Sequence, residues 1–247
     1  MKGSPGVTST ALALAAVWPR QVVLLEADPA GGDLAYRCKA AYGGLLYTDR
    51  GVLTLAAAMR DGLADPDAIA AQAQLLACGV NVIPGVASVA QARGVGQLWS
   101  TIAEACQAAD VDVIADLGRL DRASTVMPLA KAAEVFLPVV ATTFDSVMHL
   151  NEGLQDLVSA LVTDGRARIV PLLVGRDEYA GSDLAELDRV LGTHGLPISP
   201  AMPIPADPRT LDRVQEGEKA TGRLSRTLLL RGARAVAQTI LQPAGVL

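Results

Sequence analysis

Short runs of apolar residues alternate along the chain with longer stretches in which apolar positions recur every three or four residues. The short runs are almost purely apolar, whereas a strand with one solvated face alternates polar and apolar side chains. They therefore predict strands that are buried on both faces. These runs cover residues 21–26, 80–83, 111–115, 135–140, 169–174 and, more weakly because of its prolines, 198–204.

The stretches between these runs have the apolar spacing of helices. They cover residues 8–17, 53–60, 66–77, 89–109, 124–133, 146–162, 182–194 and 225–241. Strands that alternate with helices of this length are typical of a parallel sheet with helices on both faces. We therefore expect a three-layer α/β/α fold with a mostly parallel central sheet. Because no linker or repeat interrupts the pattern, residues 1–247 are expected to form one domain.

Composition narrows the class of protein. Hydrophobic residues make up 51% of the 247 residues and aromatic residues only 3%, which excludes a disordered chain and fits a core of alanine, valine and leucine. The net charge of −5 argues against a protein covered by nucleic acid, although a local basic patch remains compatible with it. The three cysteines are widely spaced, which fits free thiols in a reducing compartment. The polar start is unlike a secretory signal, so the expected location is cytoplasmic.

A glycine-rich segment, KGSPGVTST at residues 2–10, runs directly into an apolar helix. Small residues let backbone N–H groups close around phosphate oxygens, and a helix N-terminus favours the bound anion. Thr8 supplies a hydroxyl for Mg²⁺, whereas Val7 stands where phosphate loops usually carry a lysine. A plain glycine-rich turn capped by a hydroxyl side chain explains the same residues. This segment alone leaves both interpretations open.

Acidic residues follow two of the predicted strands. Glu26 and Asp28 come at the end of the run 21–26, and Asp116 follows the run 111–115. In open parallel sheets, ligands bind outside the carboxyl ends of the strands, and an acid in the position of Asp116 can hold metal-bound water. A solvated turn explains each acid by itself. The order of loop, first acids and Asp116 is what predicts a nucleotide site.

In these segments the sequence resembles the ParA/MinD family of P-loop ATPases, the deviant Walker-A group of the SIMIBI class. The family's loop K-G-G-x-G-K-[ST]-[ST] corresponds to residues 2–9, and its D-x-D-P-x-G motif corresponds to residues 26–31. Residues 203–208 look like the family's I-P-x-D-P segment, which flanks the adenine. The sequence G-G-D-L at residues 31–34 is similar to the pilus-localisation (TadZ/CpaE-like) branch. The resemblance extends to about residue 241.

The resemblance implies roles for individual residues. Lys2 matches the signature lysine, which reaches across an ATP-sandwich homodimer to the partner's phosphates, and Asp28 matches the acid that positions the attacking water. Mg²⁺ would be held by Thr8, Asp28 and Asp116. The residues expected to bind ATP are Gly3, Ser4, Pro5, Gly6, Val7, Thr8 and Ser9 at the phosphates and Arg176, Pro203, Ile204 and Pro205 near the base.

The sequence departs from the family pattern in three places. Val7 removes the Walker lysine, and losing one such charge commonly lowers the rate by about 10²-fold or more, so hydrolysis is expected to be weak or absent. Gly175 replaces an asparagine near the adenine, and Arg176 beside it is either a base-stacking residue or a solvated arginine. The family's first strand, in the middle of the sheet, has no counterpart before Lys2. We therefore expect a sheet that lacks its central strand.

Three hypotheses of function follow. The first is a nucleotide-dependent dimeric switch for localisation or partitioning, recruited by a protein partner to a cell pole, the nucleoid or the inner membrane. The second is a nucleotide-free scaffold that binds a partner complex. The third is an active partitioning ATPase on nonspecific DNA, for which the basic residues are Arg209, Arg213, Lys219, Arg223, Arg226, Arg231 and Arg234. Direct membrane binding is not expected, because the terminal helix has no aromatic anchors.

Overall fold

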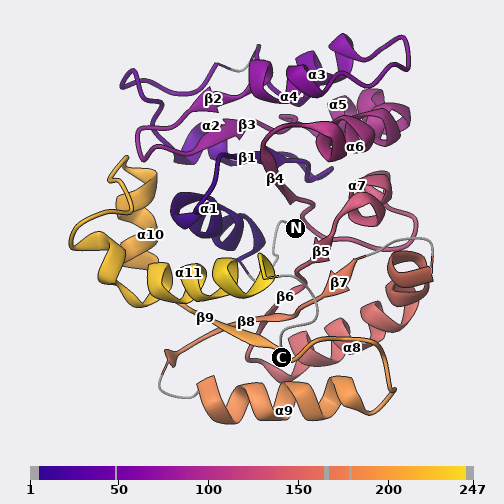
Figure 1. Ribbon diagram of the computed structural model, residues 1–247, viewed down its shortest axis with the longest axis vertical. Helices are drawn as coiled ribbons and strands as arrows, with labels where there is room; N and C mark the ends of the chain where they lie inside the picture. The colour runs from indigo at the N-terminus through magenta and orange to yellow at the C-terminus, as the bar shows by residue number, and fades with distance from the viewer. Residues whose placement is uncertain (1–5, 48, 164–166, 178–179, 243–247) are drawn as a thin grey trace.

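The computed structural model describes residues 6–47, 49–163, 167–177 and 180–242 (Figure 1). It has the expected α/β architecture, with helices packed on both faces of parallel strands. The strands are β1 (Val22–Glu26), β2 (Gln74–Leu75), β3 (Asn81–Ile83), β4 (Asp112–Asp116), β5 (Val135–Phe136), β6 (Val139–Ala141), β7 (Arg168–Ile169), β8 (Leu172–Gly175) and β9 (Met202–Pro205). The helices are α1 (Val7–Val17), α2 (Leu34–Arg37), α3 (Val52–Ala58), α4 (Pro66–Gln72), α5 (Val89–Val95), α6 (Trp99–Ala108), α7 (Met127–Ala132), α8 (Phe144–Val158), α9 (Ala180–Gly192), α10 (Pro208–Gln215) and α11 (Leu228–Ile240).

The strands form separate sheets rather than one continuous sheet. One sheet has the order β2-β3-β1-β4 and is parallel except for the antiparallel pair of β2 and β3. The other large sheet has the order β6-β8-β9 and is parallel throughout, and β5 pairs with β7 beside it. In Figure 1 the first sheet lies in the upper half of the molecule and the second in the lower half. Among the described residues, no strand pairs with the free edge of β4 or of β6.

The strand β1 shows why its sequence is apolar without alternation. Val23 and Leu25 pack into a hydrophobic cluster with α3 to α8, whereas Val22 and Leu24 pack into a second cluster with α1 and α11. All five residues of β1 are buried. Successive side chains of a strand point to opposite faces, so a strand covered on both faces needs apolar side chains at every position.

Several predicted elements differ from those observed, and proline accounts for two of the differences. The runs 135–140 and 169–174 each divide into two short strands, at Pro138 and at Pro171. Proline has no N–H to donate, so regular pairing stops there. Backbone hydrogen bonds nevertheless continue across the break, from Val170 N–H to Phe136 O (2.9 Å) and from Leu172 N–H to Pro138 O (2.8 Å).

Other differences concern the ends of helices. The predicted helix 66–77 ends at Gln72, and the antiparallel edge strand β2 follows it. The predicted helix 89–109 is divided by a 3₁₀ turn that starts at Gly96. The short helices α2 and α10 were not predicted. In the part of the chain that the structure describes, no helix is long and apolar enough to cross a lipid bilayer.

Candidate functional site

The first turn of α1 begins at a glycine whose backbone conformation favours glycine. Gly6 is the N-cap residue and has φ 92° and ψ 26°, a left-handed conformation that side chains other than hydrogen disfavour. The Thr10 N–H donates to Gly6 O at 2.8 Å. No described side chain caps this helix. Among residues 6–10, which the structure describes, no hydroxyl takes the capping position of the alternative interpretation.

The predicted phosphate-binding residues divide into two groups. Lys2, Gly3, Ser4 and Pro5 lie outside the described residues. Val7, Thr8 and Ser9 form the start of α1 together with Gly6, and all four are half-buried. The part of the loop that is described thus lies at the helix N-terminus, where the helix dipole favours a negative charge.

The three predicted metal-binding side chains, Thr8, Asp28 and Asp116, come together beside this helix. The Thr8 hydroxyl and Asp28 both lie near enough to the Asp116 carboxylate to shift its pKa, the hydroxyl by hydrogen bonding and Asp28 by its charge. The Gly118 N–H donates to Asp116 Oδ1 at 3.0 Å, and the Ala30 N–H donates to Asp28 Oδ1 at 2.7 Å. A Cβ atom on Gly118 would collide with the carboxylate of Asp28. Gly118 therefore lets the two acid-bearing loops approach each other.

Asp116 is the chemically unusual member of the group. It is 1% exposed, and its Oδ2 has no hydrogen-bond partner among the described residues. Burial raises the pKa of Asp116, and the charges of Asp28 and Asp33 act in the same direction, while the hydrogen bonds from Thr8 and Gly118 lower it. A buried carboxylate oxygen without a partner is costly unless a cation binds it.

Mg²⁺ fits this donor set. Mg²⁺ prefers oxygen ligands and is commonly held by one or two carboxylates together with water and substrate phosphates. Asp116 Oδ2 and the Thr8 hydroxyl supply such oxygens, and Asp28 lies next to them. No group of three or more His, Cys, Asp or Glu side chains suited to a metal occurs among the described residues. A bound Mg²⁺ would thus depend on Thr8 and on ligands from outside the protein.

Glu26 has a different place from the one that the sequence suggested. It is 2% exposed, and its carboxylate accepts hydrogen bonds from the backbone N–H groups of Asp33 (2.6 Å), Leu34 (3.0 Å) and Gly85 (2.9 Å). Burial raises the pKa of Glu26, whereas these three hydrogen bonds lower it. Glu26 therefore ties the loop after β1 to the loop after β3, and its carboxylate is directed at protein backbone.

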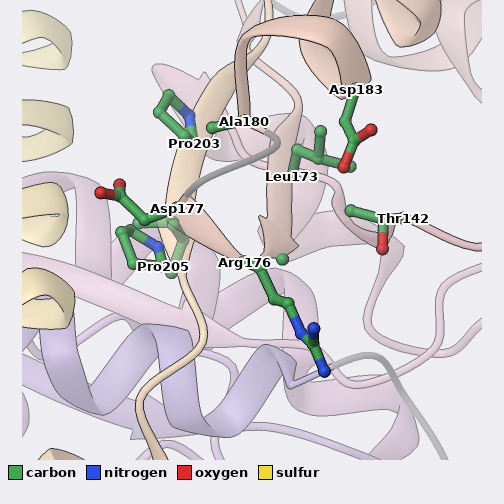
Figure 2. A pocket seen from close by; sticks show the side chains of 10 residues that line it. Thr142, Leu173, Arg176, Asp177, Ala180, Asp183, Pro203 and Pro205 are labelled. Atoms are coloured by element: carbon green, nitrogen blue, oxygen red, sulfur yellow. The ribbon is translucent and has the colours of Figure 1, made fainter.

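The residues predicted to lie near adenine line one small pocket at the carboxyl ends of β8 and β9 (Figure 2). They are Arg176, Pro203, Ile204 and Pro205. The volume of the pocket is about 10 Å³, which is room for about one water molecule. Figure 2 shows the side chain of Arg176 extending away from Pro203 and Asp183. A purine would therefore need a rearrangement of these residues or would lie on the rim of the pocket.

Two further features of this region have structural explanations. A Cβ atom on Gly175 would lie 2.5 Å from Thr142 Cγ2, so the close packing of the ends of β6 and β8 requires glycine there. Asp207 is the N-cap of α10, and its Oδ1 accepts from the Thr210 N–H at 3.0 Å, with Pro208 in the first turn. The segment 203–208 is thus a strand end followed by a capped helix start.

Comparisons with known proteins identify the architecture. No protein-family model matches the sequence, and no curated protein matches it either. The structure is similar to that of a ParA family ATPase from Chlorobium tepidum, with a TM-score of 0.69, 17% identity and coverage of 96% of this chain and 94% of that one. It is also similar to the cell division ATPase MinD from Pyrococcus furiosus, with a TM-score of 0.66, 17% identity and coverage of 97% and 94%. The chain has the ParA/MinD fold.

A third similar structure is a complex of McdA with ATP from Cyanothece, with a TM-score of 0.58, 16% identity and coverage of 98% of this chain and 95% of that one. The α/β/α fold expected from the sequence is confirmed by these neighbours. Structural similarities at identities this low support the ParA/MinD fold alone. They do not carry over the activity, which has to be argued from the residues of this chain.

Proposed function

We propose that the chain is an ATP-binding switch of the ParA/MinD type, which forms a homodimer with nucleotide and hydrolyses it slowly or not at all. The observation that carries this proposal is the meeting of Thr8, Asp28 and Asp116 beside the start of α1. Among the described residues, Asp116 Oδ2 has no hydrogen-bond partner and no side chain caps this helix. A helix N-terminus favours phosphate, and an orphaned carboxylate beside a hydroxyl favours Mg²⁺. A triphosphate with its magnesium satisfies both.

Within this proposal each residue has a role. Gly6 and the first turn of α1 bind the phosphates with the loop at residues 2–5, Thr8 and Asp116 hold Mg²⁺, and Asp28 orients the attacking water. Arg176 and the segment 203–205 lie beside the base, with Arg176 swung from its present position. Bound Mg²⁺ would neutralise charge that develops on the phosphates.

The weak hydrolysis follows from Val7. This residue begins α1 and carries no donor, so the β- and γ-phosphates lack one positive charge that most phosphate loops supply. Lys2, reaching across the dimer, would be the remaining loop lysine at the phosphates. A protein that binds ATP and keeps it would remain dimeric for long periods, which suits a positional marker for another complex.

The decisive experiment measures ATP binding and turnover on the full chain. We expect isothermal titration calorimetry to show ATP binding with Mg²⁺ and much weaker binding with EDTA. Val7→Lys should increase phosphate release by about 10²-fold, and Val7→Leu is the matched control that should leave it unchanged. Lys2→Ala should abolish ATP-dependent dimerisation in light scattering. The absence of any ATP-dependent heat from a folded chain would refute the proposal.

The nucleotide-free scaffold remains the second candidate, because the pocket beside Arg176 has a volume of only about 10 Å³. If that hypothesis is correct, Lys2→Ala has no effect on oligomeric state and ATP does not raise the melting temperature. The partitioning ATPase on DNA is the third candidate. One of its basic residues, Arg213, forms an ion pair with Glu218 at 2.6 Å, which reduces the charge available to phosphate. A salt-dependent gel shift with random duplex DNA separates it from the other two.

The narrower assignment to a pilus-localisation branch rests on the G-G-D-L segment alone. Asp33 and Leu34 of this segment supply two of the three backbone N–H groups that bind Glu26, so the local structure gives them a role in loop geometry. The narrowest version of this proposal is that the chain binds a pilus-related partner. Co-purification from the source organism would identify the cargo.

A further inference from the structure

Two of the three cysteines of the chain come together at one edge of the first sheet. Cys38 directly follows α2, and Cys78 lies in the tight turn that joins β2 to β3. Both side chains are buried, at 2% and 6% exposure, and both belong to the hydrophobic cluster that includes α1 and α11. Both thiols are free in the structure. The two residues are far apart in the sequence, so it is the fold that brings them together.

The backbone shows how their two segments meet. The segment after Cys38 runs antiparallel to the end of β2, and the Ala77 N–H donates to Lys39 O at 2.9 Å. Cys38 comes directly before this hydrogen bond on one segment, and Cys78 comes directly after it on the other. Opposite residues of antiparallel segments have Cα atoms about 4.5–5.5 Å apart, and a disulfide spans Cα distances of about 4.4–6.8 Å. We therefore expect the two cysteines to lie at about the spacing that a disulfide requires.

The two thiols are also close enough to act on each other. Burial is the main cause that raises the pKa of Cys38 to about 12, and the charge of Cys78 is the next. Arg37 lowers the pKa of Cys38 and Glu26 raises it, both to a smaller extent. Burial also raises the pKa of Cys78. Because the thiolate is the reactive form, both thiols are unreactive as long as they stay buried.

Cys106 provides a comparison within the same chain. It lies in α6 and packs against the other hydrophobic cluster. Burial alone raises the pKa of Cys106 to about 12, with no contribution from another thiol. Cys106 is therefore a thiol in a similar apolar environment without a neighbouring cysteine.

The segment that carries Cys38 lies at the surface of the molecule. Tyr36, Arg37 and Lys39 are exposed, whereas Cys38 and Ala40 are buried. The helix α2 ahead of it has only four residues. Segments with few buried side chains open at a lower free energy than the core does. Local opening of this segment would expose the thiols while the strands stay paired.

The same segment is connected to the candidate site. The N–H groups of Asp33 and Leu34 bind the Glu26 carboxylate in the loop after β1. The Cys38 N–H then donates to Leu34 O at 3.0 Å and closes α2. A covalent bond between Cys38 and Cys78 would hence fasten the loop after β1 to the β2–β3 turn.

We propose that Cys38 and Cys78 are a redox-sensitive pair, which forms an intramolecular disulfide with a small-molecule disulfide such as oxidised glutathione as the oxidant. One protein thiolate attacks a sulfur of the small disulfide and releases one reduced thiol. The second protein thiolate attacks the protein sulfur of this mixed disulfide, and the second reduced thiol leaves. The two cysteines thus lose two electrons and two protons, which the small disulfide takes up. The reaction does not depend on nucleotide binding.

The test maps disulfides after oxidation. The full chain is incubated with oxidised glutathione at mildly alkaline pH, and a second sample is refolded from urea in the same buffer, so that burial cannot limit access to the thiols. Peptides are then analysed by mass spectrometry without reduction. We expect a peptide pair linked through Cys38 and Cys78, and a melting temperature raised by about 5–10 °C because the bond restricts the unfolded chain. Dithiothreitol should reverse both changes.

Two variants give the matched comparison. Cys38→Ala keeps a small apolar side chain in the core and should show neither the linked peptides nor the rise in melting temperature, whereas Cys106→Ala should show both. The proposal is overturned if the refolded chain has no bond between Cys38 and Cys78, or if Cys106 enters disulfides as often as these two do. If a variant does not fold, the peptide map of the unchanged chain decides by itself.

Discussion

At the scale of single residues, the site is defined by what each carboxylate contacts. Glu26 and Asp116 are both buried at the ends of paired strands. Glu26 accepts three backbone hydrogen bonds, whereas one oxygen of Asp116 has no partner among the described residues. The sequence placed both acids at the ligand edge. It could not separate their roles, because the three N–H groups that satisfy Glu26 come from loops brought together only by folding.

Asp116→Asn tests this difference. Burial raises the pKa of Asp116 in the folded chain above its usual 3.8, so its contribution to stability is complete below pH 3.8 and is lost as the pH rises through the raised value. At pH 7 we therefore expect the variant to melt at a higher temperature than the wild type without ligand. This difference should close as the pH is lowered through the raised pKa, and stabilisation by Mg²⁺-ATP should be lost.

Asp110→Asn, at an exposed position ahead of β4, is the control and should change stability by less than about 0.5 kcal/mol. Differential scanning calorimetry measures both variants between about pH 3.5 and 7.5. This range runs from about the usual pKa of a carboxylate upward, where a raised pKa takes effect. An Asp116→Asn chain that is less stable than wild type at every pH would contradict the account of its burial.

At the scale of elements, the sequence located the long strands and missed two short elements. The strand runs were located closely, since β1, β3 and β4 begin and end within about one residue of prediction. Helix α10 was missed because it is short and has few apolar residues, but its start signal is present in the sequence as Asp207 followed by Pro208. The edge strand β2 was missed because Gln74 and Leu75 have no strand-like composition and owe their form to pairing with β3.

Asp207→Ala measures how much this cap contributes. Its Oδ1 accepts the Thr210 N–H, and its other oxygen lies 2.5 Å from the Thr210 hydroxyl. We expect the free energy of unfolding to fall by about 0.5–2 kcal/mol, read from urea denaturation. Asp207→Asn keeps an acceptor oxygen and should retain most of that stability. Equal losses in the two variants would mean that charge rather than capping is responsible.

At the scale of the whole molecule, helices connect the two sheets where strands do not. Helix α1 contacts β1 and β4, and it packs along α11, which in turn contacts β9. Figure 1 shows α11 beside α1, between the two sheets. This helix pair and the helices on the opposite face are what connect the two sheets. That residues 1–247 form one domain stays a prediction, which unfolding experiments can test.

Leu230→Ala addresses that connection. Leu230 lies in α11 and is fully buried, so removing its side chain atoms should lower the free energy of unfolding by about 2–5 kcal/mol. Leu228→Ala, in the same helix but 45% exposed, is the matched control and should cost less than about 0.5 kcal/mol. Urea denaturation followed by circular dichroism gives both values. Similar losses in both variants would show that α11 does not hold the sheets together.

The sequence by itself determined the class of fold, the alternation of strands and helices, and the segments that carry the acids and the loop. It did so because apolar periodicity, proline and glycine act over a few residues and can be read locally. Tertiary structure alone decided that Glu26 turns inward, that Thr8 reaches Asp116, and that a cleft opens between β4 and β6. These features depend on contacts between segments far apart in the chain, and no local pattern encodes such contacts.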